Sequence, residues 1–209
     1  MTKFPEPPSA DELRQRLAPR IHVLPKGFLL WKIYAQDPAR QVEWYSFRYY
    51  GPVNKSRFDH HLLPPYLQRR GIYYAAQNAI TCVAEVFQEG RTIDTTNPNI
   101  WLVGFEITRE LRLLDLSGTW PTAAQASMAI GTGPRSRARR WSQAIYEAYP
   151  DVEGLLYCSS MHANKPAVAL YERAENAIPA QPYYHNRLSD PLLRVALENA
   201  ADDLGYGLL

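Results

Sequence analysis

Residues 71–87, with the sequence GIYYAAQNAITCVAEVF, constrain the fold most strongly because a strand pattern changes to a helix pattern within a few positions. The β-branched and aromatic residues Ile72, Tyr73 and Tyr74 follow a glycine and predict a strand. Asn78 stands where a helix N-cap belongs, since its side chain can accept a hydrogen bond from a free backbone amide. Apolar residues then recur at the spacing of one helix face, at Ala79, Cys82, Val83, Val86 and Phe87.

Two side chains of this stretch are candidates for a site. Tyr74 ends the predicted strand, and Glu85 falls beside the apolar face of the predicted helix. A cavity between the helix and the sheet would have both side chains on its wall. Each residue alone has an ordinary explanation, since glutamates that flank an apolar face are usually solvated and tyrosines are frequent in this chain.

The composition indicates one soluble globular domain. The chain has 209 residues, of which 46% are hydrophobic and 21% are charged, and its net charge of +2 gives no general attraction to nucleic acid or membranes. No apolar run approaches the ~20 residues of a membrane span, and the first residues lack the apolar core of a signal peptide. The two cysteines need no disulfide, so a cytoplasmic protein is expected. The spacing of cysteines and histidines matches no metal site.

The remaining pattern predicts short elements joined by many turns. Residues 9–12 have the form of a capping box and start a short helix, whereas residues 1–8, with three prolines, predict a loose arm. Strands are expected at 28–34, 42–50, 100–107, 111–116, 154–159 and 167–171, and further helices begin near 135 and 190. Residues 62–70 and 172–188 predict loops. The short link at 108–110 predicts that the strands on either side of it are neighbours in the sheet.

Arginines occur at two places that bear on function. Arg57 follows a Gly-Pro turn; an arginine there is usually at the surface, but its guanidinium can also hold a phosphate through paired hydrogen bonds. Arg135, Arg137, Arg139 and Arg140 lie at the start of a predicted helix, where positive charge opposes the helix dipole. The cluster indicates a solvated basic face, unless an anion or an acidic partner compensates its charge. On a chain of near-neutral charge it does not predict nucleic-acid binding.

Ser159 ends the strand predicted over residues 154–159. A serine in this position usually caps a turn or satisfies local backbone groups. No histidine lies at a spacing that suggests a catalytic triad, so Ser159 is not expected to act as a nucleophile.

A set of short motifs, in their order along the chain, resembles the RES-domain toxins, which are named for an arginine, a glutamate and a serine. The motifs are Arg57-Phe58, Gly71-x-x-Tyr74-x-Ala76, Glu85 eleven positions after Tyr74, and Gly154-Leu-x-Tyr157-x-Ser159. Members commonly have glycine before the arginine, where this chain has Ser56, and the 62–70 loop is longer than usual. Arg48 and Arg70 are therefore alternative candidates for the place of Arg57.

The resemblance implies a mixed α/β fold (mixed α+β), a single domain with a mixed central sheet flanked by helices, like that of the ADP-ribosyltransferases. It divides the chain into three parts. Residues 1–30 form an N-terminal arm with a short helix, and residues 31–172 form the NAD-binding catalytic domain. Residues 173–209 form a C-terminal extension, whose helix packs on the domain or at an interface.

The resemblance also implies a toxin of a bacterial toxin–antitoxin system that cleaves the nicotinamide–ribose bond of NAD+ by hydrolysis or phosphorolysis, without a metal. One alternative is an ADP-ribosyltransferase that modifies a protein, and another is a non-catalytic domain that binds a nucleotide or a partner. The acceptor, whether water, phosphate or a protein, stays open. The expected partner is an Xre-type helix-turn-helix antitoxin that blocks the active site, and the terminal helix suggests a homodimer within such a complex.

Within this resemblance, the chemistry gives a role to each of four residues. Breaking the bond creates an oxocarbenium-like ribose, and the carboxylate of Glu85 is expected to stabilise its positive charge. Arg57 is expected to bind the pyrophosphate, and Tyr74 to hold or stack on the nicotinamide ring. Ser159 is expected to orient Glu85 or the nicotinamide ribose by hydrogen bonding. The simpler alternatives are an ion pair between Arg57 and Glu85 and a core position for Tyr74.

Overall fold

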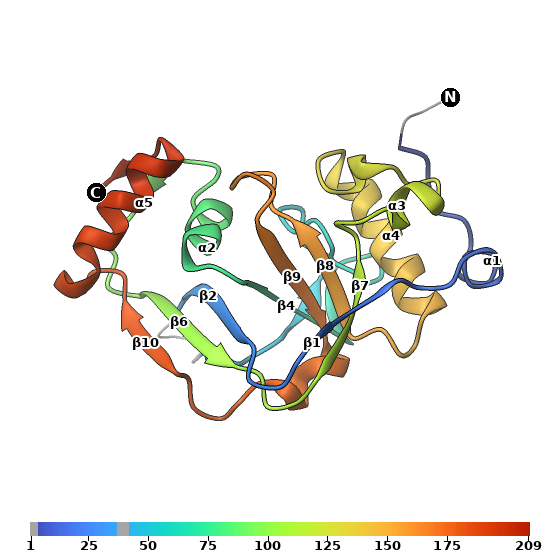
Figure 1. Cartoon of the computed structure of the whole chain (residues 1–209), viewed down its shortest axis with the longest axis horizontal. Helices are drawn as coiled ribbons and strands as arrows, with labels where there is room; N and C mark the ends of the chain where they lie inside the picture. Colours follow the sequence, from blue (N-terminus) through green and yellow to red (C-terminus); the bar gives the residue numbers. More distant parts are fainter. Residues whose placement is uncertain (1–3, 37–41) are drawn as a thin grey trace.

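The computed structural model describes residues 4–36 and 42–209. Its α-helices are α1 (Ala10–Arg16), α2 (Ala79–Val86), α3 (Trp120–Ala123), α4 (Arg135–Ala148) and α5 (Arg194–Leu204). Its strands are β1 (Ile21–Leu24), β2 (Leu29–Ala35), β3 (Arg48–Gly51), β4 (Tyr66–Ala76), β5 (Thr92–Ile93), β6 (Ile100–Glu106), β7 (Leu111–Asp115), β8 (Gly154–Cys158), β9 (Pro166–Tyr171), β10 (Tyr184–Arg187) and β11 (Gly207–Leu208). Short 3-10 helices occur at η1 (Met128–Ile130), η2 (Glu172–Ala177) and η3 (Pro191–Leu193). Figure 1 shows α2 and α5 towards one end of the molecule and α1, α3 and α4 towards the other.

Most of the strands form one mixed sheet. They follow one another in the order β1-β7-β8-β9-β4-β2-β6-β10, and β3 adds to β4 as a ninth strand. β7 and β8 run parallel, whereas the other paired strands of this sheet are antiparallel. The expected mixed α/β fold, with a mixed central sheet flanked by helices, is thus confirmed. The division of the chain at residues 30 and 172 stays a prediction; β1 and β10, from the two flanking parts, form the two ends of the sheet.

β4 begins earlier than predicted and is 11 residues long. Its first part pairs with β3, where Tyr50 lies opposite Leu67, and its second part pairs with β9, where Tyr74 lies opposite Ala169. The prediction of a loop over residues 62–70 is therefore wrong from residue 66 onward. The residues there are mostly exposed or charged and show no alternation of apolar and polar residues. Backbone hydrogen bonds to β3, rather than burial of side chains, stabilise this part of the strand.

β6 and β7 are consecutive along the chain but are not neighbours in the sheet, contrary to the prediction. β6 lies between β2 and β10, and β7 lies between β1 and β8, so the two strands are well separated in Figure 1. The link between them is held by η2 instead, because the amide of Thr108 donates to the carbonyl of Ala177 at 2.9 Å. β1 and β10 formed where no strand was predicted; most of their residues are partly exposed, so they show little apolar periodicity.

α2 starts at the predicted position, but β4 runs on to Ala76, two residues past its predicted end at Tyr74, and the connection has two residues. The side chain of Asn78 accepts a hydrogen bond from the amide of Ile80 at 2.7 Å and caps the helix. Cys82 and Val83 pack on the sheet, and the thiol of Cys82 donates to the carbonyl of Trp31 at 3.0 Å. Val86, in contrast, is 48% exposed, so the buried face of α2 is turned away from the predicted stripe.

The buried face of α2 differs from the predicted one because residues from the C-terminal part of the chain pack on this helix. Thr81 and Ala84 are buried although neither belongs to the predicted apolar face. The hydroxyl of Tyr206, which follows α5, donates to the carbonyl of Ala84 at 3.3 Å. The imidazole of His162, in the turn after β8, lies 2.9 Å from the hydroxyl of Thr81. Neighbours from distant parts of the chain therefore cover a second side of α2.

The N-terminal segment is packed rather than loose from residue 4 onward; residues 1–3 lie outside the described part. The ring of Phe4 is 4% exposed, and the indole of Trp141 donates to the carbonyl of Pro5 at 2.9 Å. The carboxylate of Glu6 pairs with Arg137 at 3.0 Å and also with Arg140. An acidic residue far away in the sequence thus compensates both arginines; Arg137 is partly buried, whereas Arg140 stays exposed, as expected for a solvated face.

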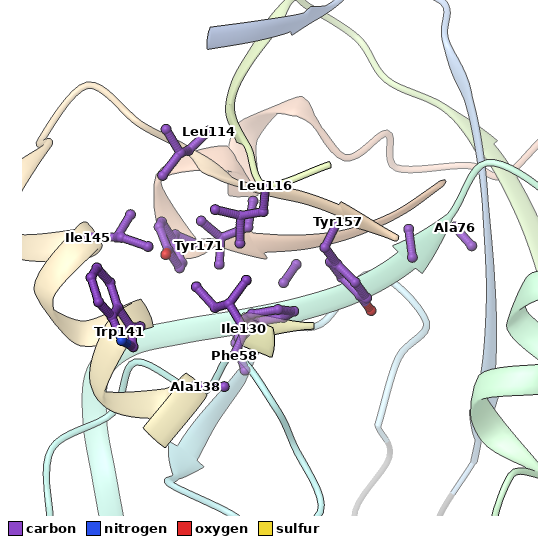
Figure 2. Packing of buried hydrophobic residues seen from close by; sticks show 14 of the residues in the cluster. Phe58, Ala76, Leu114, Leu116, Ile130, Ala138, Trp141, Ile145, Tyr157 and Tyr171 are labelled. Atoms are coloured by element: carbon purple, nitrogen blue, oxygen red, sulfur yellow. The ribbon is translucent and has the colours of Figure 1, made fainter. Parts of the chain in front are cut away.

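The loop that carries Arg57 is anchored by buried polar residues that follow it. The carboxylate of Asp59 is buried, accepts a hydrogen bond from the amide of Val53 at 2.6 Å and pairs with Arg48. The hydroxyl of Ser142 on α4 donates to the carbonyl of Phe58 at 2.8 Å. Figure 2 shows Phe58 beside Ile130 and Tyr157 among the buried side chains. These contacts give the loop a defined position on the sheet.

His60, which follows Asp59, is buried in the core and also holds this loop in place. Its ring packs against the rings of both Tyr146 and Tyr171, with each centroid 4.4 Å away, and its Nε2 lies 3.3 Å from Oε2 of Glu172. Burial lowers the pKa of His60 from 6.5 to about 4. The imidazole is therefore neutral in the folded protein near neutral pH.

Replacing Asn78 by alanine is expected to lower the free energy of unfolding by about 1 kcal/mol, because the amide of Ile80 loses its side-chain acceptor. Asn199→Ala, an exposed change within α5, is the matched control and should alter stability by less than about 0.5 kcal/mol. Urea unfolding of both variants measures the difference. Equal unfolding free energies for the two variants would contradict the role of the cap.

Stability is expected to fall as the pH is lowered from 7 to 5, partly because of His60. The unfolded chain takes up a proton near pH 6.5, whereas the folded protein resists protonation of His60 until about pH 4. The unfolded state thus binds more protons in this window, and the His60 contribution to the loss is about 2 kcal/mol. His60→Asn should make the difference in unfolding free energy between pH 7 and pH 5 smaller by that amount. A difference that stays the same in the variant would assign the pH dependence to other groups.

Candidate functional site

A cavity of about 190 Å³ lies where β4, α2 and the first turn of α4 meet. Five parts of the chain line it: the loop before Phe58, β4, α2, the residues around the start of α4, and the end of β8 with the residues after it. The lining residues are Lys55, Ser56, Arg57, Tyr74, Glu85, Val86, Gln88, Gly131, Arg135, Tyr157, Cys158 and Ser160. The cavity therefore brings together three of the four predicted site residues, Arg57, Tyr74 and Glu85.

Tyr74 and Glu85 reach the cavity from the two sides of the β4–α2 connection. The hydroxyl of Tyr74 accepts a hydrogen bond from the amide of Phe58 at 3.1 Å, and burial raises the pKa of its phenol, which stays protonated. Glu85 is half-buried on α2. Among residues 4–36 and 42–209, nothing forms a hydrogen bond or an ion pair with its carboxylate. Glu85 thus presents a negative charge to the cavity without an internal partner.

Arg57 lines the cavity from the loop before Phe58 and has no carboxylate partner within the described chain. Its Nη1 donates to the carbonyl of Gly133 at 2.6 Å, which orients the guanidinium. Burial and the nearby charge of Arg135 lower the pKa of Arg57 below its usual value, and the charge of Glu85 opposes that shift. The guanidinium nevertheless stays cationic at neutral pH. No ion pair joins Arg57 to Glu85, so the simpler alternative of a structural salt bridge does not hold.

A second arginine, Arg135, also faces the cavity and was not predicted as a site residue. It is the first residue of α4, and its Nη2 donates to Oε1 of Gln88 at 3.0 Å. The signal was present in the sequence, because positive charge at a helix N-terminus is unfavourable unless an anion offsets it. Of the predicted basic cluster, Arg135 is the member that lines the cavity. Arg139 instead donates to the carbonyls of the loop before Arg57, including that of Asn54 at 3.1 Å.

The two alternative arginines are engaged elsewhere. Arg48 pairs with the buried carboxylate of Asp59. Arg70 pairs with Glu147 at 2.7 Å and donates to the carbonyl of His60 at 2.8 Å. Neither of them lines the cavity. The geometry therefore favours Arg57 as the arginine of the site.

Ser159 lies directly behind the cavity wall. Its side chain is buried, and its Oγ accepts hydrogen bonds from the amides of Met161 and His162, each at 3.2 Å. Its neighbours Cys158 and Ser160 line the cavity in its place. Ser159 thus caps the turn after β8, as serines in this position usually do, and a direct role towards Glu85 or a ribose stays a prediction.

Tyr157 provides the apolar part of the wall, a role that the sequence motif did not reveal. Its ring packs on that of Phe58 with centroids 4.8 Å apart. Figure 2 shows these two side chains near each other. Burial and the charge of Glu85 raise the pKa of Tyr157 well above its usual value, so its phenol is neutral. The cavity thus combines neutral aromatic rings with one carboxylate, two guanidinium groups and the ammonium group of Lys55.

This arrangement suits a ligand that carries both signs of charge. A carboxylate without an internal partner stabilises positive charge that develops nearby, and guanidinium groups bind phosphate oxygens through charge-assisted hydrogen bonds.

Among the described residues, no group of three or more histidine, cysteine, aspartate or glutamate side chains is arranged to hold a metal. Within the same residues, no helix is long and apolar enough to cross a membrane.

The fold and the sequence both have counterparts among known proteins. A chain of the M. tuberculosis MbcT-MbcA toxin-antitoxin complex superposes on this structure with a TM-score of 0.56 and 18% sequence identity, covering 90% of this chain and 98% of that chain. At this identity the likeness establishes a shared fold. A comparison with curated protein sequences gave no match. The sequence model of the RES domain matches residues 29–192, a range that contains Arg57, Tyr74, Glu85 and Ser159. This chain therefore belongs to the RES-domain family.

Proposed function

We propose that this protein cleaves the nicotinamide–ribose bond of NAD+ and acts as the toxin of a bacterial toxin–antitoxin system. The observation that carries the proposal is the position of the Glu85 carboxylate, which faces the same cavity as Arg57 and Tyr74 and has no partner within the described chain. Membership of the RES-domain family and the fold shared with a chain of a toxin–antitoxin complex support the toxin role.

The residues of the cavity match the charges of the proposed substrate. The nicotinamide ring of NAD+ is cationic and its diphosphate is anionic, so the carboxylate of Glu85 suits one half and the guanidinium groups of Arg57 and Arg135 suit the other. The ring of Tyr74 offers an aromatic face to nicotinamide. NAD+ is the substrate in this scheme, and the reaction needs no further cofactor.

The proposed reaction breaks the bond between C1′ of the ribose and the ring nitrogen of nicotinamide. Both electrons of that bond go to the nitrogen, which neutralises the ring, so the leaving group needs no proton. The ribose becomes an oxocarbenium-like cation, and Glu85 stabilises its charge in the transition state. Water then adds to C1′ and releases a proton to solvent; in phosphorolysis a phosphate oxygen adds instead.

The proposal extends to a partner and a place in the cell. A toxin that consumes NAD+ needs an inhibitor, and the proposed inhibitor is an antitoxin of the Xre helix-turn-helix type that covers the cavity. Both proteins act in the bacterial cytoplasm in this proposal, and a homodimer of the toxin within the complex is part of it. The chain of the structural neighbour also comes from a toxin–antitoxin complex.

The acceptor of the ADP-ribose group separates the two enzymatic alternatives. With NAD+ labelled in the adenosine half, hydrolysis or phosphorolysis leaves the label on a small molecule, whereas a transferase leaves it on a polypeptide of an added cell extract. Free nicotinamide appears in each case. The non-catalytic alternative predicts that no nicotinamide is released at all.

Glu85→Gln is expected to reduce the rate of nicotinamide release by at least about 100-fold, because the amide cannot stabilise the developing positive charge. The change keeps the size of the side chain, so the fold should be retained. Glu198→Gln, which changes a partly buried glutamate of α5 that does not line the cavity, is the matched control and should keep full activity. Release of nicotinamide by the purified proteins is the measurement. Similar rates for Glu85→Gln and Glu198→Gln would remove Glu85 from the mechanism.

Arg57→Gln is expected to raise the KM for NAD+ by at least about tenfold, because a charge-assisted hydrogen bond to the diphosphate contributes roughly 1.5–3 kcal/mol. Arg70→Gln changes the arginine that pairs with Glu147 outside the cavity and should leave the KM unchanged. Steady-state kinetics of both variants provides the comparison. If Arg70→Gln raised the KM and Arg57→Gln did not, the arginine of the site would have been misassigned.

A further inference from the structure

A larger hollow of about 550 Å³ adjoins the cavity that contains Glu85. Gly131, Tyr157 and Cys158 line both spaces and form the boundary between them. The cavity at Glu85 measures about 190 Å³ and is smaller than the ~300 Å³ at which small-molecule pockets begin. It therefore has room for one half of a dinucleotide, and the adjoining hollow offers room for the rest.

The walls of the larger hollow suit a flat, mostly apolar group. Phe58, Leu116 and Ile130 are almost completely buried and provide an apolar floor, and Figure 2 shows all three close together. Ser117 and Asn164 stand at its exposed edge and carry groups that can donate and accept hydrogen bonds. An apolar floor with few polar groups at the rim is typical of a pocket for an aromatic base.

The two loops beside this hollow are held in an unusual backbone conformation. Gln125 and Ser127 precede η1 and have φ values of 67° and 61°, and Ala163 and Asn164 follow β8 with values of 43° and 59°. Among the described residues, Arg91 is the remaining non-glycine residue with positive φ. Left-handed backbone at non-glycine residues costs energy and is concentrated at ligand-binding sites. Its accumulation next to one hollow, which Asn164 lines, supports a binding role for that space.

Positive charge lies beside the boundary between the two spaces. Arg57 donates to the carbonyl of Gly133, two residues after the shared Gly131, and Arg135 follows shortly after in the same segment. A diphosphate that passes from one space to the other would run past both guanidinium groups. We propose that the larger hollow is the adenosine subsite, with the diphosphate beside Arg57 and Arg135. This assignment rests on NAD+ as the proposed substrate and adds how the dinucleotide lies.

Thiol labelling tests the subsite without any catalytic readout. Cys158 is partly exposed and lines both spaces, whereas Met128 is 47% exposed and lines only the larger hollow. In the full-length Met128→Cys/Cys158→Ser protein, the introduced thiol reports on the larger hollow alone. Cys82 is buried and serves as the unreactive internal reference. The probes are AMP, which carries the adenosine half, and nicotinamide mononucleotide, which carries the other half.

AMP is expected to slow the labelling of the thiol introduced by Met128→Cys, by about tenfold at ten times its dissociation constant, since only the free protein reacts. Nicotinamide mononucleotide should leave that rate unchanged but slow the labelling of Cys158 in the unaltered protein. Asn164→Cys in the Cys158→Ser background places a second reporter at the rim of the same hollow and should behave like Met128→Cys.

Lack of protection by AMP at both introduced thiols would overturn the adenosine subsite, even if the protein cleaves NAD+. Protection of these thiols by nicotinamide mononucleotide rather than AMP would also overturn it, because the dinucleotide would then lie in the reverse direction. If AMP protects as expected while NAD+ is not cleaved, the subsite stands and the proposed reaction fails. The two hypotheses can thus fail separately.

Discussion

The connection from β4 to α2 determines where the ring of Tyr74 and the carboxylate of Glu85 lie in the site. The hydrogen bond from the amide of Ile80 to the side chain of Asn78 ends the strand and starts the helix at a fixed point. Tyr74 precedes that point on the central strand, and Glu85 follows it on a helix held to the sheet by Cys82. Because this segment is short and capped, the ring and the carboxylate stay close along the chain, and the contacts of α2 with Trp31, His162 and Tyr206 fix the orientation in which both face one cavity.

The positive side of the cavity depends on long-range packing instead. Phe58 is held by the hydroxyl of Tyr74 on one side and by Ser142 of α4 on the other, so the loop with Arg57 is tied to both the strand and the helix. The carbonyl of Gly133 then orients the guanidinium of Arg57. Carboxylate and guanidinium stay apart, and each charge remains free for a ligand. This separation distinguishes a binding site from a structural ion pair, in which the two charges would neutralise each other.

The sequence predicted those parts of the molecule that depend on local pattern. The strand, cap and helix over residues 71–87 agree with the structure because propensity and capping act within the segment, whereas the face of α2 that is buried depends on distant neighbours and was not predicted correctly. The separation of β6 from β7 and the early start of β4 were missed because strand pairing between distant segments decides them. Arg135 was seen as part of a basic cluster, but its place on the cavity wall follows from how α4 packs. The burial of Ser159 behind that wall was likewise invisible, since the motif specifies a residue type and not the direction of its side chain.

The most direct measurement of the central claim is a crystal structure of the Glu85→Gln variant with NAD+ bound. We expect the nicotinamide ribose beside residue 85, the ring against Tyr74 and the diphosphate beside Arg57 and Arg135. A dinucleotide bound elsewhere, or one bound with residue 85 turned away from its ribose, would contradict the claim that these residues form one site.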